Sequence, residues 1–160
     1  MTNKVTVTPK GEREIVIQRA FSAPRKLVFD AMSKPDMMKQ WFHGPPGWTL
    51  VTCEIDLRVG GKYRWVWHNN DGHDMGMGGV YREIVPPERI VSTEKFDQSW
   101  YPGEALGTLV LTEQNGGTLM TLTMQYASSE AREAVMRSPM KNGLEIGYGR
   151  LEEYLNTVAA

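Results

Sequence analysis

A stripe of apolar residues near the C-terminus constrains the fold more than any other feature of this sequence. Apolar residues recur at three- and four-residue intervals within residues 138–158, which places them on one face of a helix. They are Met140, Leu144, Tyr148, Leu151, Leu155 and Val158. Ser138 followed by Pro139 is typical of a helix start, so we expect Ser138 to cap this helix. A helix with such a face has to bury it against another element.

The pattern before that helix predicts a sheet as its partner. One strand is expected over residues 14–21, followed by two short helices that begin near Ser22, as a cap, and Pro35. Further strands are expected over residues 48–55, 62–70, 73–85, 89–96, 106–114 and 118–126. Short turns between successive strands imply antiparallel pairing. The sequence therefore predicts a single α+β domain over residues 1–160, with a curved sheet around the C-terminal helix and residues 1–13 loosely held.

The segment HNNDGHDMGMGG, residues 68–79, combines a turn signal with two histidines and four glycines. Asp71-Gly72 favours a two-residue hairpin, which pairs Trp67 with Gly76 and Trp65 with Gly78. In that register the glycines leave space beside the rings of Tyr63, Trp65 and Trp67, which share one strand face. His68 and His73 lie near the turn without a third ligand, so we interpret the segment as a solvated hairpin rather than a metal site.

The same register predicts three apolar residues on the outer face of the hairpin, namely Val66, Met75 and Met77. We interpret them as scattered surface residues. The alternative is an apolar patch that forms a homodimer contact.

Composition and motifs exclude several classes of function. A net charge of −1 gives no electrostatic basis for binding nucleic acid or an acidic membrane. The lone cysteine, Cys53, suits a reducing compartment and is expected to be buried and structural. The polar N-terminus and the lack of a long apolar run suggest a cytoplasmic protein. No cofactor motif is present and no acid–base pair stands out, and we expect Glu94 and Asp97 to face solvent.

Aromatic, methionine and glycine residues are the remaining signal. The chain has 5 tryptophans and 10 methionines, and methionine is common both in cores and at permissive binding surfaces. Gly143, Gly147 and Gly149 lie within the expected C-terminal helix, where glycine is unfavourable. Two explanations remain open: a strand approaches the helix closely there, or the glycines leave space for a ligand.

Several long stretches resemble one family. They are RAFSAPRKLVFDAMSKPDMMKQWFHGPPGW, DLRVGGKYRW, GGVYREIVPPERIV, GTLVLTEQNGGTLMTLTMQY and MKNGLEIGYGRLEEYL. Together they resemble the SRPBCC (START/Bet v 1-like) superfamily, in the branch named for the activator of Hsp90 ATPase. The resemblance implies a helix-grip fold of seven strands around a long helix, often with an apolar cavity between them. It implies no catalytic set, and this chain is shorter than the activator itself.

The leading hypothesis from the sequence is a small-molecule binding protein with an apolar cavity. The expected lining residues are Tyr63, Trp65, Trp67, Phe96, Met124, Met140, Leu144 and Tyr148, with Trp41 and Trp48 near the mouth. The alternatives are a partner of an Hsp90-like chaperone, which rests on the resemblance, and a cyclase or hydrolase that works inside the cavity. A buried polar residue with a shifted pKa inside the cavity would favour the enzyme.

Overall fold

The computed structural model describes residues 4–159, which form eight strands and four helices. The strands are β1 (Thr6–Lys10), β2 (Glu14–Phe21), β3 (Trp48–Ile55), β4 (Lys62–Asn69), β5 (Asp74–Val85), β6 (Arg89–Phe96), β7 (Ala105–Gln114) and β8 (Gly117–Gln125). The helices are α1 (Arg25–Ala31), α2 (Pro35–Met38), α3 (Ser129–Met136) and α4 (Met140–Ala159).

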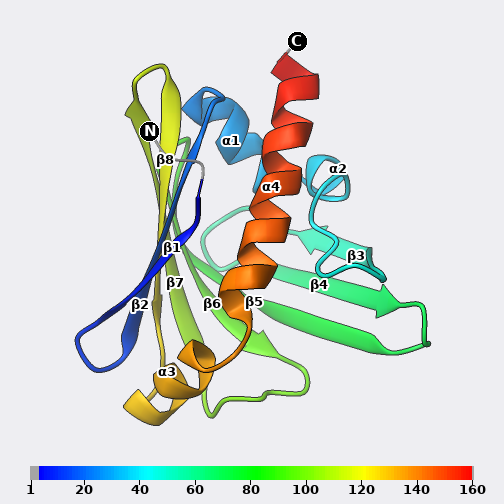
Figure 1. Cartoon of the computed structure of the whole chain (residues 1–160), viewed down its shortest axis with the longest axis vertical. Coiled ribbons are helices and arrows are strands. Elements are labelled where there is room, and N and C mark those ends of the chain that lie inside the picture. The colour runs from blue at the N-terminus through cyan, green and yellow to red at the C-terminus, as the bar shows by residue number, and fades with distance from the viewer. Residues whose placement is uncertain (1–3, 160) are drawn as a thin grey trace.

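The strands form one antiparallel sheet in the order β1-β2-β8-β7-β6-β5-β4-β3, and the sheet curves around α4 (Figure 1). This arrangement confirms the predicted α+β helix-grip fold, with two short helices after the strand at residues 14–21. The predicted number of six to seven strands was too low. Of residues 1–13, which were expected to be loosely held, Thr6–Lys10 forms the edge strand β1, paired with β2, and Val5 is buried. Residues 1–3 lie outside the described residues.

Three local predictions about the helices were wrong. Ser22 does not cap α1, because Pro24 occupies the N-cap position and forms no side-chain cap. Ser138 does not cap α4; its hydroxyl donates to the carbonyl of Val135 at the end of α3. Helix α3 was missed altogether, although Ser128 caps it by accepting a hydrogen bond from the amide of Ala131 over 3.1 Å.

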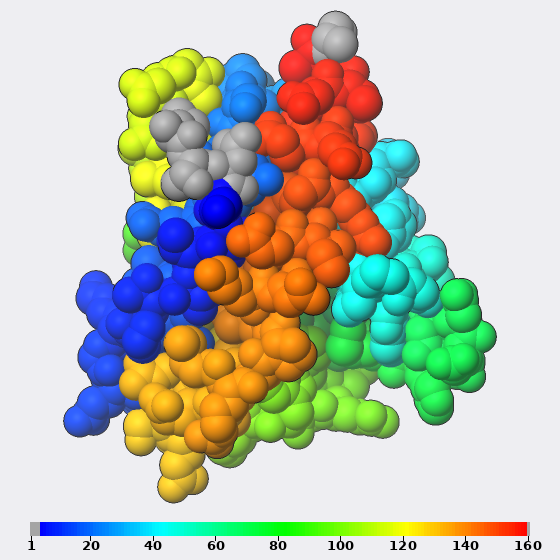
Figure 2. All heavy atoms as spheres, in the orientation of Figure 1, coloured from blue at the N-terminus to red at the C-terminus, as the bar shows by residue number. Residues whose placement is uncertain are grey.

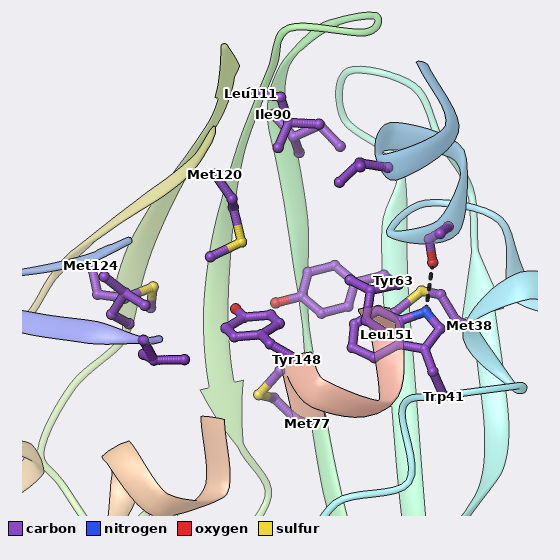
Figure 3. Packing of buried hydrophobic residues seen from close by; sticks show 14 of the residues in the cluster. Met38, Trp41, Tyr63, Met77, Ile90, Leu111, Met120, Met124, Tyr148 and Leu151 are labelled. Atoms are coloured by element: carbon purple, nitrogen blue, oxygen red, sulfur yellow. Dashed lines mark hydrogen bonds between the residues drawn. The ribbon is translucent and has the colours of Figure 1, made fainter. Parts of the chain in front are cut away.

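The apolar stripe of α4 lies against the core, as its spacing predicts. Tyr148, Leu151 and Leu155 are buried, while Met140 and Leu144 are partly buried and pack against the same core. Figure 3 shows Tyr148 and Leu151 of α4 among buried residues of the sheet and of α2. Val158 is exposed, so the stripe reaches solvent before the helix ends.

Polar contacts hold α4 on both of its sides. Arg19 of β2 forms a salt bridge to Glu152 over 2.8 Å, and the amide of Val5 donates to Glu145. On the other side, Arg150 donates to the carbonyl of Gly44 over 2.7 Å. In Figure 2, α4 (orange to red) accordingly runs as a ridge between the N-terminal strand and the segment that contains α2. None of the helices between residues 4 and 159 has the length and hydropathy that a bilayer-spanning helix needs.

Candidate functional site

The β4–β5 hairpin differs from its predicted register by one residue. Trp67 pairs with Met75, and Trp65 pairs with Met77. The amide of Asn69 donates to the carbonyl of His73, and the Asn69 side chain accepts from the amides of Asp71 and His73. This side chain closes a longer turn than Asp71-Gly72 alone predicts, and the longer turn shifts every pair that follows.

The shift moves Met75 and Met77 to the inner face of the sheet, opposite the tryptophans. The predicted position of Met75 and Met77 on the outer face is therefore wrong, and this removes the reason for the alternative of a homodimer contact there. Gly76 instead lies opposite Val66, and a side chain at Gly76 would collide with the ion pair between Arg64 and Asp97. On the outer face this ion pair takes the room that the glycine leaves.

The two histidines of the hairpin do not come together with other metal ligands. The Nδ1 atom of His68 lies 2.6 Å from a carboxylate oxygen of Asp74, its direct partner across the strands. Among the described residues, no group of three or more His, Cys, Asp or Glu side chains has the arrangement of a metal site. Cys53 is buried, and burial raises the pKa of its thiol, which agrees with a structural role.

The residues predicted to line a cavity all lie in the core or pack directly against it. The buried members are Trp41, Tyr63, Trp67, Met124 and Tyr148, and the partly buried members are Trp48, Trp65, Phe96, Met140 and Leu144. Two of the indoles are bound to backbone, because Nε1 of Trp41 donates to Ala31 and Nε1 of Trp67 donates to Phe42. Trp41 is thus buried, and Trp48 keeps partial exposure.

The position of Glu94 differs from the one expected from the sequence. It was expected to face solvent, but it pairs with Ala105 of β7 and lies on the same inner face as Phe96, two residues further along β6. Its carboxyl lies among protein atoms, although the residue retains some accessible surface. Asp97, by contrast, is exposed as expected and binds Arg64.

Burial raises the pKa of Glu94 to about 7, and the hydrogen bond from Tyr101 opposes this rise. The Tyr101 hydroxyl donates to Oε1 of Glu94 over 3.1 Å. No basic side chain contributes to the pKa of this carboxyl, so its charge has no cationic partner among the described residues. A buried acid of this kind is half ionised near neutral pH.

Three more tyrosines are close enough to Glu94 for its charge to raise the pKa of each, beyond the larger effect of burial. They are Tyr63, Tyr126 and Tyr148, and with Tyr101 and Glu94 they form what we call the tyrosine–glutamate cluster. The cluster joins β4, β6, the β6–β7 loop, the end of β8 and helix α4. Figure 3 shows the side chains of Tyr63 from the sheet and Tyr148 from α4, both within the core.

Two hydroxyls of the cluster have no hydrogen-bond partner. Tyr63 donates to the carbonyl of Thr93 and Tyr101 donates to Glu94, but no described residue binds the hydroxyl of Tyr126 or of Tyr148. Tyr126 is 4% exposed and Tyr148 is 8% exposed, yet neither hydroxyl is among the polar atoms that the fold seals off completely. Both hydroxyls can therefore form a hydrogen bond with water or with a ligand.

The glycines of α4 give no close approach to a strand. A side chain at Gly143, Gly147 or Gly149 would meet nothing within 4 Å beyond its own helix. Of the two explanations that the sequence left open, close packing is therefore wrong, and open space beside the helix is what the structure contains.

The β6–β7 loop separates the cluster from a recess in the surface. The recess has a volume of about 400 Å³ and is lined by Tyr101, Trp100, Lys95 and Gly103, among others. Tyr101 is itself buried, and its ring packs edge-on against Tyr126 with centroids 5.3 Å apart. One side chain thus lines the recess and also binds the interior carboxyl.

Part of the cluster had a signal in the sequence. Glu94 and Tyr126 each lie two residues from a residue that was predicted to line the interior, Phe96 and Met124, and strand alternation puts them on the same face. Tyr101 comes from a loop, and no periodicity predicts where its side chain points.

Comparisons with known proteins agree with this architecture. A family model described as Activator of Hsp90 ATPase homolog 1-like protein matches residues 22–156. A comparison with curated proteins gives no match. A crystal structure of a Rhodobacter sphaeroides protein is 29% identical, with a TM-score of 0.91 over 96% of this chain and 99% of that one.

Two further solved structures show the range of the likeness. A protein from Chromobacterium violaceum is 27% identical, with a TM-score of 0.70 over 91% of this chain and 96% of that one. An AHSA1-like protein from Aeromonas hydrophila has a TM-score of 0.70 over 91% of this chain and 94% of that one, and at 17% identity it supports the fold alone. The family match covers most of the sequence, and the fold agrees with it: the chain belongs to the Activator of Hsp90 ATPase homolog 1-like family.

Proposed function

We propose that this protein binds a small, largely apolar molecule between helix α4 and the inner face of the sheet. The observation that carries the proposal is the tyrosine–glutamate cluster, which places one carboxyl, and two hydroxyls without a partner among the described residues, against the apolar core. Ligand sites typically combine apolar walls with a few convergent polar groups of this kind.

The surroundings of the cluster support the same proposal. Trp65, Phe96 and Leu144 belong to the interior but remain partly exposed, which is expected where side chains border unfilled space. Open space beside Gly147 adds to this picture. The recess lined by Tyr101 is the entry route that we propose, because the same side chain binds Glu94.

A fluorescence titration tests the proposal. The protein is titrated with N-phenyl-1-naphthylamine, a neutral apolar dye that becomes fluorescent in apolar sites, and unlabelled hydrophobic compounds then compete with it. Leu144→Phe is expected to weaken dye binding, because the larger ring fills interior space. Asn142→Phe adds the same ring at an exposed position of the same helix and should leave binding unchanged. Saturable binding that neither variant alters, or no binding, contradicts the proposal.

The cluster also supports a second candidate, an enzyme that works by proton transfer. A carboxyl with a pKa of about 7 can accept and return a proton at neutral pH, as general acid–base catalysis requires. Turnover of any competing compound that Glu94→Gln abolishes, while the compound still binds, supports this candidate. Equal turnover by the variant excludes Glu94 as its acid or base.

Membership of the family supports a third candidate, an interaction with an Hsp90-like chaperone. It rests on the family's description, because no described surface of the chain is matched to such a partner. The test is the ATPase rate of the host chaperone with and without this protein. An unchanged rate together with no binding in a pull-down excludes the interaction.

A further inference from the structure

We propose that the molecule bound in the interior carries a positive charge, held by Glu94 and surrounded by the tyrosine rings of the cluster. The ligand is then an amphipathic amine or quaternary ammonium ion with an apolar body. This inference rests on the proposed function and adds the chemical class of the ligand.

The first argument is the missing counter-charge at Glu94. The carboxyl lies among protein atoms, and within residues 4–159 its one hydrogen bond comes from the hydroxyl of Tyr101. By contrast, the buried guanidinium of Arg19 has a group of opposite charge beside it, the carboxylate of Glu152. A buried carboxylate without a cation is unfavourable, so a cationic ligand stabilises the charged form more than a neutral ligand does.

The second argument is the nature of the groups around the carboxyl. The cluster places tyrosines from four other parts of the chain near Glu94, and the faces of aromatic rings attract cations. The hydroxyl oxygens of Tyr126 and Tyr148 are unpaired and can accept hydrogen bonds from an ammonium group. Carboxylate, ring faces and hydroxyl oxygens each favour positive charge in their neighbourhood.

The third argument concerns which other titratable groups can interfere. The groups that face Glu94 are Tyr101 from the loop, Tyr126 from the end of β8, Tyr148 from α4 and Tyr63 from β4. Burial raises the pKa of each of these tyrosines, so all four stay neutral at physiological pH. The charge of Glu104 also acts on Tyr63, but Glu104 is exposed, so the buried charge of the site near pH 7 is set by Glu94.

The test compares two ligands of the same shape and different charge. One is a 4-phenylbutyl trimethylammonium ion, and the other is its neutral tert-butyl isostere, each measured by competition with the neutral dye. The cation is expected to bind at least about tenfold more tightly than the isostere, because only the cation gains a desolvated contact with the carboxylate. A tenfold ratio corresponds to about 1.4 kcal/mol of binding free energy. A quaternary ion does not titrate, so its affinity should rise with pH as Glu94 ionises, while that of the isostere stays constant.

Glu94→Gln is the matched variant, because glutamine has nearly the same shape without the charge. It should remove both the preference for the cation and its pH dependence, and leave binding of the isostere unchanged. Equal binding of the two ligands by the natural protein, or a preference that persists in Glu94→Gln, overturns the inference but leaves the proposed function intact. Failure of the dye and both ligands to bind overturns the proposed function as well. The pH series on the unmodified protein decides the question even if the variant does not fold.

Discussion

The hydroxyl of Tyr101 lies 3.1 Å from Oε1 of Glu94, and this contact joins the β6–β7 loop to a carboxyl on the inner face of the sheet. A hydrogen bond to a carboxylate is stronger than one to a neutral carboxylic acid. The strength of the hydrogen bond between the loop and the sheet therefore depends on the ionisation of Glu94.

We expect the ionisation of Glu94 to lower the stability of the fold. Its pKa is about 7 in the folded protein and near the ordinary value of 4.5 in the unfolded chain. Between these values the folded state holds a proton that the unfolded state releases, so its contribution to stability is complete below pH 4.5 and is lost as pH rises through 7. The full loss is at most about 3 kcal/mol, less the screening that partial exposure provides.

Glu94→Gln removes this dependence. The free energy of unfolding of both proteins is measured by urea unfolding at pH 5 and pH 8. Relative to the natural protein, the variant should be more stable at pH 8 than it is at pH 5. Glu113→Gln, at an exposed position on β7, serves as the control and should show no such change. A Glu94→Gln difference that is the same at both pH values contradicts the pKa assignment.

Removing the Tyr101 hydroxyl should raise the pKa of Glu94 further. The hydrogen bond from Tyr101 favours the charged carboxylate, so Tyr101→Phe makes ionisation harder and moves the midpoint of the pH-dependent stability to higher pH. Tyr126→Phe deletes a hydroxyl that binds no described residue and is the matched control. The midpoints are compared by thermal unfolding across a pH series, and equal midpoints for the two variants would show that the Tyr101 contact has no effect.

The salt bridge between Arg19 and Glu152 should be costly to break. Arg19 is 6% exposed, and its guanidinium also lies over the ring of Phe21, 4.7 Å from its centroid. Glu152→Ala leaves this charge buried without a partner, for which a loss of about 3–5 kcal/mol is typical. Glu153→Ala changes the neighbouring exposed residue of α4 and should stay within about 0.5 kcal/mol of the natural protein. Similar denaturation midpoints for both variants rule out a stabilising role for the pair.

Gly143→Ala should stabilise the protein. Gly143 is exposed within α4, and a side chain there meets nothing within 4 Å. Replacing a helical glycine with alanine is worth up to about 1 kcal/mol when no clash occurs. The expected result is a higher melting temperature with unchanged dye binding. A lower melting temperature would mean that the open space beside Gly143 is not available to a side chain.

The sequence predicts the larger features of this fold because they repeat. The stripe from Leu144 to Leu155 and the alternation along β4 extend over many residues, so single exceptions do not hide the period. The features that were predicted wrongly depend on single side chains. The side-chain oxygen of Asn69, which accepts hydrogen bonds within the turn, sets the hairpin register. The hydroxyl of Ser128 caps a helix of only eight residues.

The candidate site was predicted in part for the same reason. Its aromatic walls follow from periodicity, and so does the face that Glu94 shares with Phe96. A charged residue on an inner face contradicts the general rule that charges face solvent, and that rule led to the wrong expectation for Glu94. The position of Tyr101 depends on how an eight-residue loop folds back onto the sheet, which no local pattern determines.

The two edges of the sheet carry features that discourage further strands from joining it. On β3 the register shifts between Leu50 and Thr52, so the exposed Val51 between them has no partner on β4 and the outer edge is irregular. On β1, Pro9 has no amide hydrogen to offer a neighbouring strand. An eight-stranded open sheet is a template for aggregation wherever its edge is straight and fully bonding, and these two interruptions protect the chain against edge-to-edge association.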